Sequence, residues 1–279
     1  MIRGILWDLD ETLIVEESAV VAAFTSAAEL AAGCAGVSAA ELGVSARRCA
    51  RARWRTSPAR DFCLQVGIAS WEGLWARFEG DDEPIRLLRD WAPAYRVGTW
   101  ADALAKHGVN GRDLAAAMAA AFVEARRNTY EPYADALDAL RALHDALPMA
   151  VLTNGARCLQ REKLEGAGLA KWFDFVLVSG DIGIGKPDPR PFHVCAEHLG
   201  VEPGALLMVG DNYDRDIAGA LEAGLRSLWV DRVGAGSHPP LGSAPRDPDK
   251  VGQPDGVVRV GSLREVDVPA LRAGRLATL

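Results

Sequence analysis

The sequence has few cysteines, no long apolar run and fewer basic than acidic residues, and each shortage excludes a class of protein. Its 279 residues contain 5 cysteines, which lack the spacing of a metal site or a disulfide framework. Such a sparse and odd set predicts reduced thiols, each a small residue of the core. No apolar run reaches the roughly 18 residues that a spanning helix needs, so we expect no membrane insertion.

A shortage of positive charge argues against nucleic-acid binding. The 31 basic residues are outnumbered by 38 acidic residues, and the formal net charge is −7, whereas nucleic-acid-binding domains normally carry a basic surface. The same acidity gives no long-range attraction to an anionic substrate, which would therefore need a bound cation or a local basic group. The N-terminal segment MIRGILWDLDETL places carboxylates where a signal peptide needs apolar residues, and we expect a cytoplasmic protein.

Six short apolar runs, bounded by Gly, Asp or Asn, predict the strands of a parallel sheet. The runs do not alternate apolar with polar residues, which is typical of strands buried on both faces. Helical patterns lie between the later runs, and this order indicates an α/β fold with helices on both faces. The predicted strands are 2–10, 149–155, 173–180, 205–212, 226–232 and 256–262, and the predicted helices between them are 135–147, 157–169, 191–200 and 216–225.

The stretch from about residue 15 to residue 130 has a different pattern. It is rich in Ala, helical in pattern, for instance at 111–128, and has no convincing strand. We interpret it as a helical insertion after the first strand, with extra helices packed on the same core as the alternative. The expected division is a core of residues 1–14 and 131–279 and a helical domain of residues 15–130. Residues 234–256, rich in Gly, Pro and Asp, are expected to form a surface loop.

Arginines and tryptophans mark the helical insertion. Arg47, Arg51 and Arg55 recur at helical spacing. We interpret them as a solvated basic face, because charged stripes are usually that; recognition of an anionic or polar part of a substrate is the alternative. The tryptophans of this region are expected in its core rather than as stacking platforms; they are Trp54, Trp71, Trp75, Trp91 and Trp100.

Acidic residues gather at the predicted carboxyl ends of strands, where α/β sheets bind their ligands. Asp8 and Asp10 close the first run, and alternate residues of an extended chain point to the same side. Asp211 closes the run at 205–212 and Asp216 follows it, although a helix N-cap is the alternative for Asp216. Grouped carboxylates raise one another's pKa unless a cation lies among them. The clustering therefore predicts a metal site, and its oxygen ligands suit Mg²⁺.

The segment SGDIGIGKPDPRP offers two interpretations of one lysine. Gly180, Gly185 and Lys186 fit the first part of a nucleotide-binding P-loop, but Pro187 stands where that loop supplies a hydroxyl. The proline also biases Lys186 away from helical backbone angles. We interpret the P-loop match as accidental and assign the lysine to another kind of phosphate site.

Four short motifs occur in order along the chain: DLDETL, TNG, GKPDP and GDNYDRD. Each lies at a predicted strand end or in the loop after it, and together they resemble the signature motifs of the haloacid dehalogenase-like hydrolase superfamily. The resemblance covers roughly residues 1–14 and 131–265. It implies a Rossmann-like doubly wound parallel sheet with an inserted all-helical cap domain. The long insertion before the second motif resembles the first cap subclass of that superfamily.

The resemblance implies a role for each motif residue. Asp8 matches the nucleophile that forms an aspartyl-phosphate, and Asp10 matches the general acid and base. A carboxylate suits the first role because it is ionised at neutral pH without a separate base. The remaining implied roles are phosphate binding by Thr153, Asn154 and Lys186, Mg²⁺ binding by Asp8, Asp10 and Asp211, and support of these groups by Thr12 and Asp216.

The implied activity is that of a Mg²⁺-dependent phosphatase. Its substrate would be a small phosphomonoester metabolite, such as a sugar phosphate, a nucleotide or a biosynthetic intermediate. A phosphomutase would keep the same two acids. A 2-haloacid dehalogenase is disfavoured, since a halide leaves without protonation and would need neither Asp10 as an acid nor the metal cluster at Asp211. A non-catalytic binding or scaffold protein on the same fold is the remaining alternative.

Overall fold

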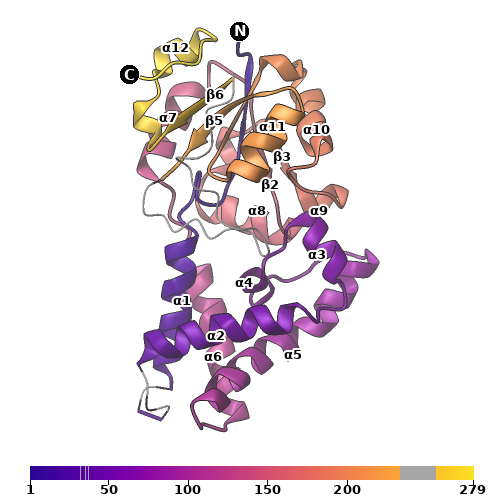
Figure 1. The fold of residues 1–279 in the computed structure, drawn as a ribbon, viewed down its shortest axis with the longest axis vertical. Coiled ribbons are helices and arrows are strands. Elements are labelled where there is room, and N and C mark those ends of the chain that lie inside the picture. Colours follow the sequence, from indigo (N-terminus) through magenta and orange to yellow (C-terminus); the bar gives the residue numbers. More distant parts are fainter. Residues whose placement is uncertain (32, 35, 37, 233–255) are drawn as a thin grey trace. The chain divides into compact units, whose positions relative to one another are not determined.

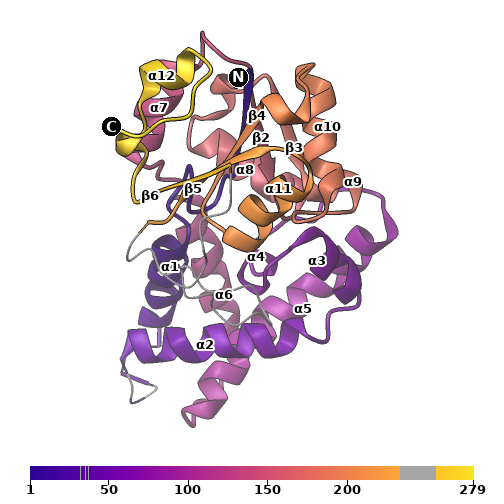
Figure 2. The same ribbon diagram turned by 45° about the horizontal axis from the view of Figure 1, so that its top comes forward.

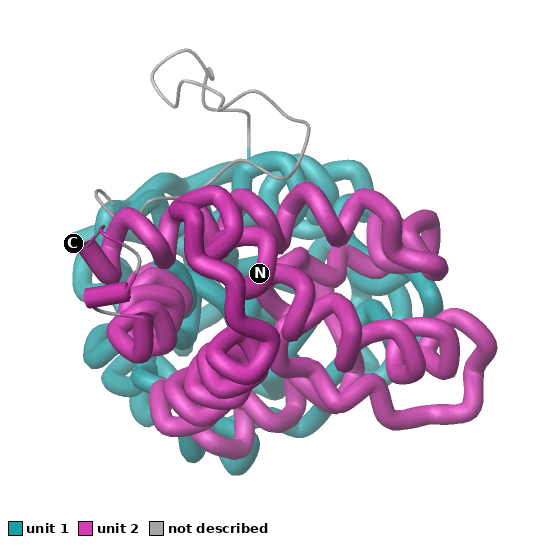
Figure 3. Tube along the Cα trace, turned by 90° about the horizontal axis from the view of Figure 1, so that it is seen from below, with its two compact units in different colours: residues 1–17, 131–153, 167–279 teal, residues 18–130, 154–166 magenta. Residues whose placement is uncertain are grey.

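The computed structural model describes residues 1–279 except 32, 35, 37 and 233–255, and it divides into two compact units. Unit 1 comprises residues 1–17, 131–153 and 167–279, and unit 2 comprises residues 18–130 and 154–166 (Figure 3). The surface loop predicted at 234–256 lies, except for residue 256, outside the described residues.

Unit 1 is built on a parallel sheet of six strands in the order β3-β2-β1-β4-β5-β6 (Figures 1 and 2). The strands are β1 (Gly4–Trp7), β2 (Met149–Thr153), β3 (Phe175–Val178), β4 (Leu206–Gly210), β5 (Arg226–Val230) and β6 (Val257–Val260). Each predicted strand is confirmed, although each observed strand is shorter than the predicted run. The strand order reverses between β1 and β4, so the carboxyl ends of these two strands form the place where such sheets bind ligands.

Helices cover both faces of this sheet (Figures 1 and 2). One face packs against α10 and α11 through an apolar cluster that includes Leu6, Leu152 and Phe192. Helix α7, with α12 beside it, lies on the other side. The helices of unit 1 are α7 (Ala134–Leu143), α9 (Ser179–Ile182), α10 (Pro189–Leu199), α11 (Gly219–Glu222) and α12 (Val268–Arg272), with a π-helical turn at Tyr213–Ala218. The α/β class predicted from the sequence is therefore confirmed.

Among its described residues, unit 2 contains helices joined by loops and no strand. Its helices are α1 (Glu17–Glu29, whose first residue belongs to unit 1), α2 (Ala39–Trp54), α3 (Arg60–Val66), α4 (Ser70–Gly73), α5 (Glu83–Lys106), α6 (Arg112–Arg127) and α8 (Arg157–Gly166). Trp54, Trp75 and Trp100 are buried in its apolar core, and Trp71 and Trp91 pack against that core while partly exposed. The core prediction is therefore confirmed for Trp54, Trp75 and Trp100 and holds only in part for Trp71 and Trp91.

The three arginines singled out in the sequence differ from the prediction. Arg47 and Arg51 of α2 are half-buried, whereas Arg55, just beyond its end, is exposed. The Arg47 guanidinium carbon lies 5.5 Å from the centre of the Trp71 ring, close enough for a cation–π interaction. The interpretation as a solvated basic face is therefore wrong for Arg47 and Arg51, because the aliphatic part of a long side chain can cover apolar surface.

Helix α8 belongs to unit 2, although it follows β2 in the chain and the predicted core included its residues. The apolar residues Ala156 and Leu159 join the core of the helical unit. Lys163 on the same helix is fully buried, and its Nζ lies 3.4 Å from Oε1 of Glu72. Apolar packing and a buried ion pair thus attach α8 to the insertion.

The cysteines are all free. Cys49, Cys63 and Cys195 are buried, as predicted for core residues, but Cys34 is exposed and Cys158 is only half-buried. The core assignment is therefore wrong for these two. Among the described residues, no helix combines the length and the apolar character that crossing a membrane requires.

Candidate active site

Three carboxylates meet at the carboxyl edge of the sheet in unit 1. Asp8 follows β1 and Asp211 follows β4, and these strands are paired neighbours in the sheet. The backbone N–H of Asp8 donates to the carbonyl of Val209 over 2.9 Å, which fixes where β1 ends. One carboxylate oxygen from each of Asp8, Asp211 and Asp216 lies within 4.8 Å of the others. The convergence predicted from the strand ends is thus observed for these acids.

Asp216 is held in place by the loop after β4. Its Oδ2 accepts a hydrogen bond of 2.9 Å from the backbone N–H of Asn212. A Cβ atom added to Gly210 would come within 2.5 Å of the Asp216 side chain. Only glycine fits there, because real Cβ atoms do not approach other heavy atoms that closely.

Lys186 is the base that the described structure brings into contact with this carboxylate cluster. Its Nζ lies 2.6 Å from Oδ1 of Asp8 and 2.7 Å from Oδ1 of Asp216, and it donates to the carbonyl of Leu152 over 2.7 Å. The side chain is buried. Asp8, Asp211 and Asp216 therefore share one ammonium group, which leaves two negative charges in excess when all three acids are ionised.

The electrostatics of the cluster follow from burial and crowding. The pKa of Asp8 is raised to about 7, because the effects of burial and of the neighbouring Asp216 charge outweigh the lowering by Lys186. Burial, Asp8 and Asp216 raise the pKa of Asp211 well above its usual range. Burial alone would lower the pKa of Lys186, but Asp216 and Asp8 outweigh it and raise that pKa. Full ionisation of the acids at neutral pH therefore requires more positive charge than Lys186 supplies, and a buried set of carboxylate oxygens fits a hard divalent cation.

Two other motif residues lie beside the cluster. The Thr12 hydroxyl is 3.4 Å from Oδ1 of Asp211 and 3.5 Å from Oδ2 of Asp8, and the residue is fully buried. Asp10 is half-buried at the start of a turn, in a bridge with Ile14, and its charge also raises the pKa of Asp8. Its carboxylate is not one of the three that converge.

The second motif is divided between the two units. Thr153 ends β2 in unit 1 and is buried. Asn154 is the first residue of the second segment of unit 2, where its backbone carbonyl accepts a hydrogen bond of 3.1 Å from Nε2 of Gln160. The predicted phosphate-binding role of both residues stays a prediction, as do the roles assigned to the acids and to Lys186.

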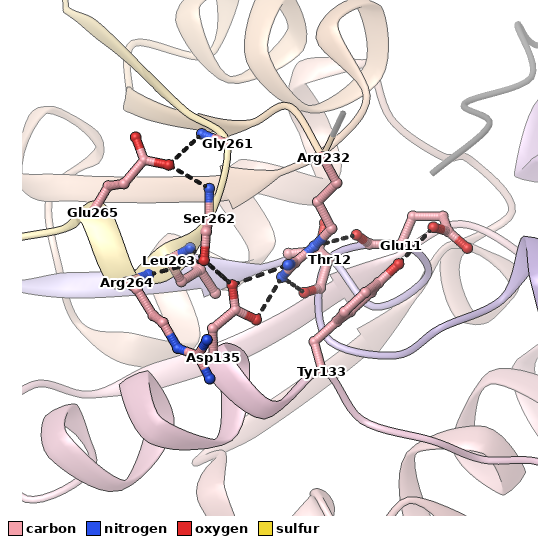
Figure 4. A network of polar contacts seen from close by, with 10 residues as sticks. All are labelled: Glu11, Thr12, Tyr133, Asp135, Arg232, Gly261, Ser262, Leu263, Arg264 and Glu265. Atoms are coloured by element: carbon pink, nitrogen blue, oxygen red, sulfur yellow. Dashed lines mark hydrogen bonds and ion pairs between the residues drawn. The ribbon is translucent and has the colours of Figure 1, made fainter. Parts of the chain in front are cut away.

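Four polar residues that sequence reasoning did not single out lie in or beside the Asp10 turn. Glu11, Tyr133, Asp135 and Arg232 form a connected network (Figure 4). The sequence carries a signal for one of them: Arg232 closes the predicted strand at 226–232, just as Asp8 closes the first one. Tyr133 and Asp135, at the start of α7, carry no comparable signal in the sequence.

Comparisons with known proteins give the family. Residues 2–224 match the family model described as haloacid dehalogenase-like hydrolase. The phosphoserine phosphatase of Thermus thermophilus is 40% identical over 265 residues, which are 94% of this chain and 96% of that protein. This match includes the helical insertion as well as the sheet.

Solved structures share the fold. A 2-haloacid dehalogenase from Pseudomonas syringae pv. Tomato has a TM-score of 0.56 at 24% identity, over 98% of this chain and 99% of that one. The HAD-hydrolase YfnB from Bacillus subtilis, solved bound to magnesium, also has a TM-score of 0.56, at 20% identity over 95% of this chain and 96% of that one. With its motifs, its sheet and these relatives, the chain belongs to the haloacid dehalogenase-like hydrolase family and is an enzyme of its phosphatase type.

Proposed function

We propose that the protein is a Mg²⁺-dependent phosphatase that hydrolyses a small phosphomonoester through an aspartyl-phosphate on Asp8. The observation that carries the proposal is the convergence of Asp8, Asp211 and Asp216 on one point beside the buried ammonium of Lys186. Such a site combines a nucleophile with a place for a divalent cation and with fixed positive charge.

The first half-reaction transfers the phosphoryl group to the enzyme. An oxygen of the Asp8 carboxylate attacks phosphorus, and the bond between phosphorus and the ester oxygen breaks. Asp10, in its protonated form, gives its proton to the leaving oxygen, so that the alcohol departs neutral. The products of this step are the alcohol, the aspartyl-phosphate and ionised Asp10.

The second half-reaction restores the enzyme. Ionised Asp10 takes a proton from a water molecule, whose oxygen attacks phosphorus. The bond between phosphorus and the Asp8 oxygen breaks, inorganic phosphate leaves, and both acids return to their initial protonation states. Asp10 thus serves each half-reaction once, as acid and then as base.

Positive charge is needed because the phosphoryl group and the acids around it are all anionic. When bound, Mg²⁺ polarises the phosphoryl oxygens and neutralises part of the charge that develops on them. Asp8 and Asp211 would hold it with side-chain oxygens and Asp10 with its backbone carbonyl. Both oxygens of Asp216 are engaged, one by Lys186 and one by Asn212, so Asp216 would support the site without binding the metal.

The phosphoryl oxygens also need hydrogen-bond donors. Lys186 offers an ammonium group, Thr153 a hydroxyl and Asn154 an amide. The larger segment of unit 2, residues 18–130, lies between the first and second motifs in the chain, and we assign it the part of a cap that keeps bulk water from the reaction.

O-phosphoserine is the first substrate to test, because the relative from Thermus thermophilus is named a phosphoserine phosphatase and matches over nearly its whole length. N-acylneuraminate-9-phosphatase of Rattus norvegicus is 35% identical over only 54% of this chain and 60% of its own length. An acylneuraminate phosphate therefore follows as a second candidate, with sugar phosphates and nucleotides after it.

A phosphate-release assay tests the proposal. Purified protein would be given a panel of phosphomonoesters with Mg²⁺, with excess EDTA, and as the Asp8→Asn variant. We expect turnover of at least one alkyl phosphate. The rate of phosphate release should fall by about 10³-fold or more in EDTA and in the variant, since the metal and the nucleophile act together. Asp138→Asn is the matched control, because Asp138 is an exposed acid that pairs with Arg141 and lies outside the four motifs. Phosphate release that persists in EDTA or in Asp8→Asn would overturn the mechanism.

A further inference from the structure

The turn that carries Asp10 has a backbone conformation that must be held from outside. Glu11, the next residue, has a φ of +62°, a value that residues other than glycine seldom adopt. Asp10 itself is only half-buried. An acid that must reach the leaving oxygen in one half-reaction and a water in the other has to be positioned within a fraction of an ångström. The contacts around Glu11 and Thr12 supply that constraint.

Arg232 binds the backbone of this turn. Its Nε donates to the carbonyl of Glu11 over 3.2 Å and its Nη2 to the carbonyl of Thr12 over 3.1 Å (Figure 4). These are the two residues that follow Asp10 in the chain. Because a guanidinium is planar and its donors have fixed directions, it holds two neighbouring carbonyls in a defined relation that a lysine cannot reproduce.

Arg232 is itself held by an acid and by an aromatic ring. Its Nη1 and Nη2 bind the two carboxylate oxygens of Asp135 over 3.0 and 3.1 Å. The guanidinium carbon lies 3.7 Å from the centre of the Tyr133 ring. Asp135 is buried and also accepts from the Ser262 hydroxyl over 2.6 Å and from the Leu263 backbone N–H over 3.0 Å. The network therefore ties the Asp10 turn to the start of α7 and to the loop after β6.

Glu11 anchors the turn from its other side. Its Oε2 accepts from the Tyr133 hydroxyl over 2.8 Å, and its Oε1 accepts from the backbone N–H groups of Glu16 and Glu17 over 2.8 and 2.6 Å. Both carboxylate oxygens are thus used within unit 1. The Glu11 side chain therefore restrains the turn from one side, while Arg232 holds the carbonyls of Glu11 and Thr12 from the other.

We propose that Arg232, held by Asp135 and Tyr133, is a positioning residue for the acid and base Asp10. Arg232 does not touch the reacting atoms; it acts by fixing the backbone of the Asp10 turn. This inference rests on the proposed function, since it assigns Asp10 the transfer of a proton to the leaving oxygen. None of the four sequence motifs includes Arg232, which lies 221 residues after Glu11.

The test exploits the leaving group. An alkoxide needs a proton as it departs, whereas 4-nitrophenolate needs almost none, so only the first depends strongly on a well-placed acid. For Arg232→Lys, kcat/KM would be measured with the best alkyl phosphomonoester of the panel and with 4-nitrophenyl phosphate. This ratio reports the steps through phosphoryl transfer to Asp8 and excludes the later hydrolysis. We expect a loss of about tenfold or more on the alkyl ester and less than about threefold on the aryl ester.

Two further variants complete the experiment. Arg259→Lys is the matched control, because Arg259 also lies over an aromatic ring, Trp229, and pairs with an acid, Asp231; we expect both substrates to be unaffected. Tyr133→Phe keeps the ring under Arg232 but removes the hydrogen bond to Glu11, and we expect the same preference for the aryl ester with a smaller loss, about two- to fivefold on the alkyl ester. If Arg232→Lys does not fold, Tyr133→Phe tests the proposal by the same comparison of the two esters.

The outcomes separate the two proposals. Equal losses on both esters in the folded variants would show a structural role only and would overturn the positioning of Asp10. A wild-type protein that releases phosphate from neither ester would overturn the proposed function, and the positioning role with it. Wild-type turnover with a loss confined to the alkyl ester supports both.

Discussion

The two units both bury charged side chains, but they balance them differently. In unit 2, one buried carboxylate, that of Glu72, pairs with one buried ammonium, that of Lys163, over 3.4 Å. In unit 1, Asp8, Asp211 and Asp216 converge on each other beside the single ammonium of Lys186. A pair of opposite charges is complete without a ligand, whereas three acids with one base have room for a cation. An excess of like charge, rather than the burial of charge, therefore distinguishes a reactive site from a structural ion pair.

Removal of the lysine in unit 1 should have the largest effect. In Lys186→Met the carboxylate cluster loses the ammonium that pairs with it, and we expect kcat/KM to fall by about 10²–10³-fold or more. Stability should also fall, by about 3–5 kcal/mol, because buried acids lose their partner. Binding of Mg²⁺ to the native state should restore part of that stability through mass action.

Phosphate release and thermal unfolding with and without Mg²⁺ measure these effects. Lys171→Met is the matched control, because Lys171 is exposed and lies over the ring of Trp172, 5.1 Å from its centre. We expect it to behave as wild type. If Lys186→Met kept wild-type activity, the lysine would have no part in phosphoryl transfer.

The corresponding change in unit 2 should affect stability without any link to metal. In Lys163→Met the Glu72 carboxylate is left buried without this partner, and we expect a loss of about 3–5 kcal/mol. Adding Glu72→Gln should recover much of it, because the neutral side chain still accepts the hydrogen bond that the Ala69 backbone N–H donates to Oε2 over 2.8 Å. Chemical unfolding of both single variants and the double variant measures the coupling. A Mg²⁺-dependent recovery in Lys163→Met would contradict the division between the two units.

The sheet of unit 1 and the acids at its edge are the parts of the molecule that can be predicted from the sequence. Every strand of unit 1 is predictable, because continuous apolar runs that alternate with helical patterns are typical of buried parallel strands. Asp8 and Asp211 can be placed together because each closes a run, and parallel strands end at the same edge of a sheet. Lys186 follows from its motif. These residues are positioned mainly by the backbone of the sheet, which the apolar pattern encodes.

The remaining contacts depend on packing that the pattern does not encode. Lys163 and Glu72 are 91 residues apart, and a lysine in a helical pattern is expected to be exposed. Asp135 and Arg232 are 97 residues apart, and the acid lies in the first turn of a helix, where acids are common for local reasons. Each partner alone looks ordinary in sequence. Only the fold brings the members of each pair together.

The smallest expected change in the free energy of unfolding concerns the ion pair between Asp135 and Arg232. Unlike the carboxylate cluster, this pair has one negative and one positive charge. Burial raises the pKa of Asp135, but hydrogen bonds from Arg232 and Ser262 outweigh burial and hold that pKa below its ordinary value. The pair therefore adds its full stability above the unfolded pKa of about 3.9, and this stability is lost as the pH falls through the lower folded value.

In Asp135→Asn we expect the free energy of unfolding to fall by about 1–3 kcal/mol at pH 7, and the difference from wild type should shrink below about pH 4. Urea unfolding of wild type and variant across this range measures the difference; a difference independent of pH would mean that the charge of Asp135 contributes nothing beyond its hydrogen bonds.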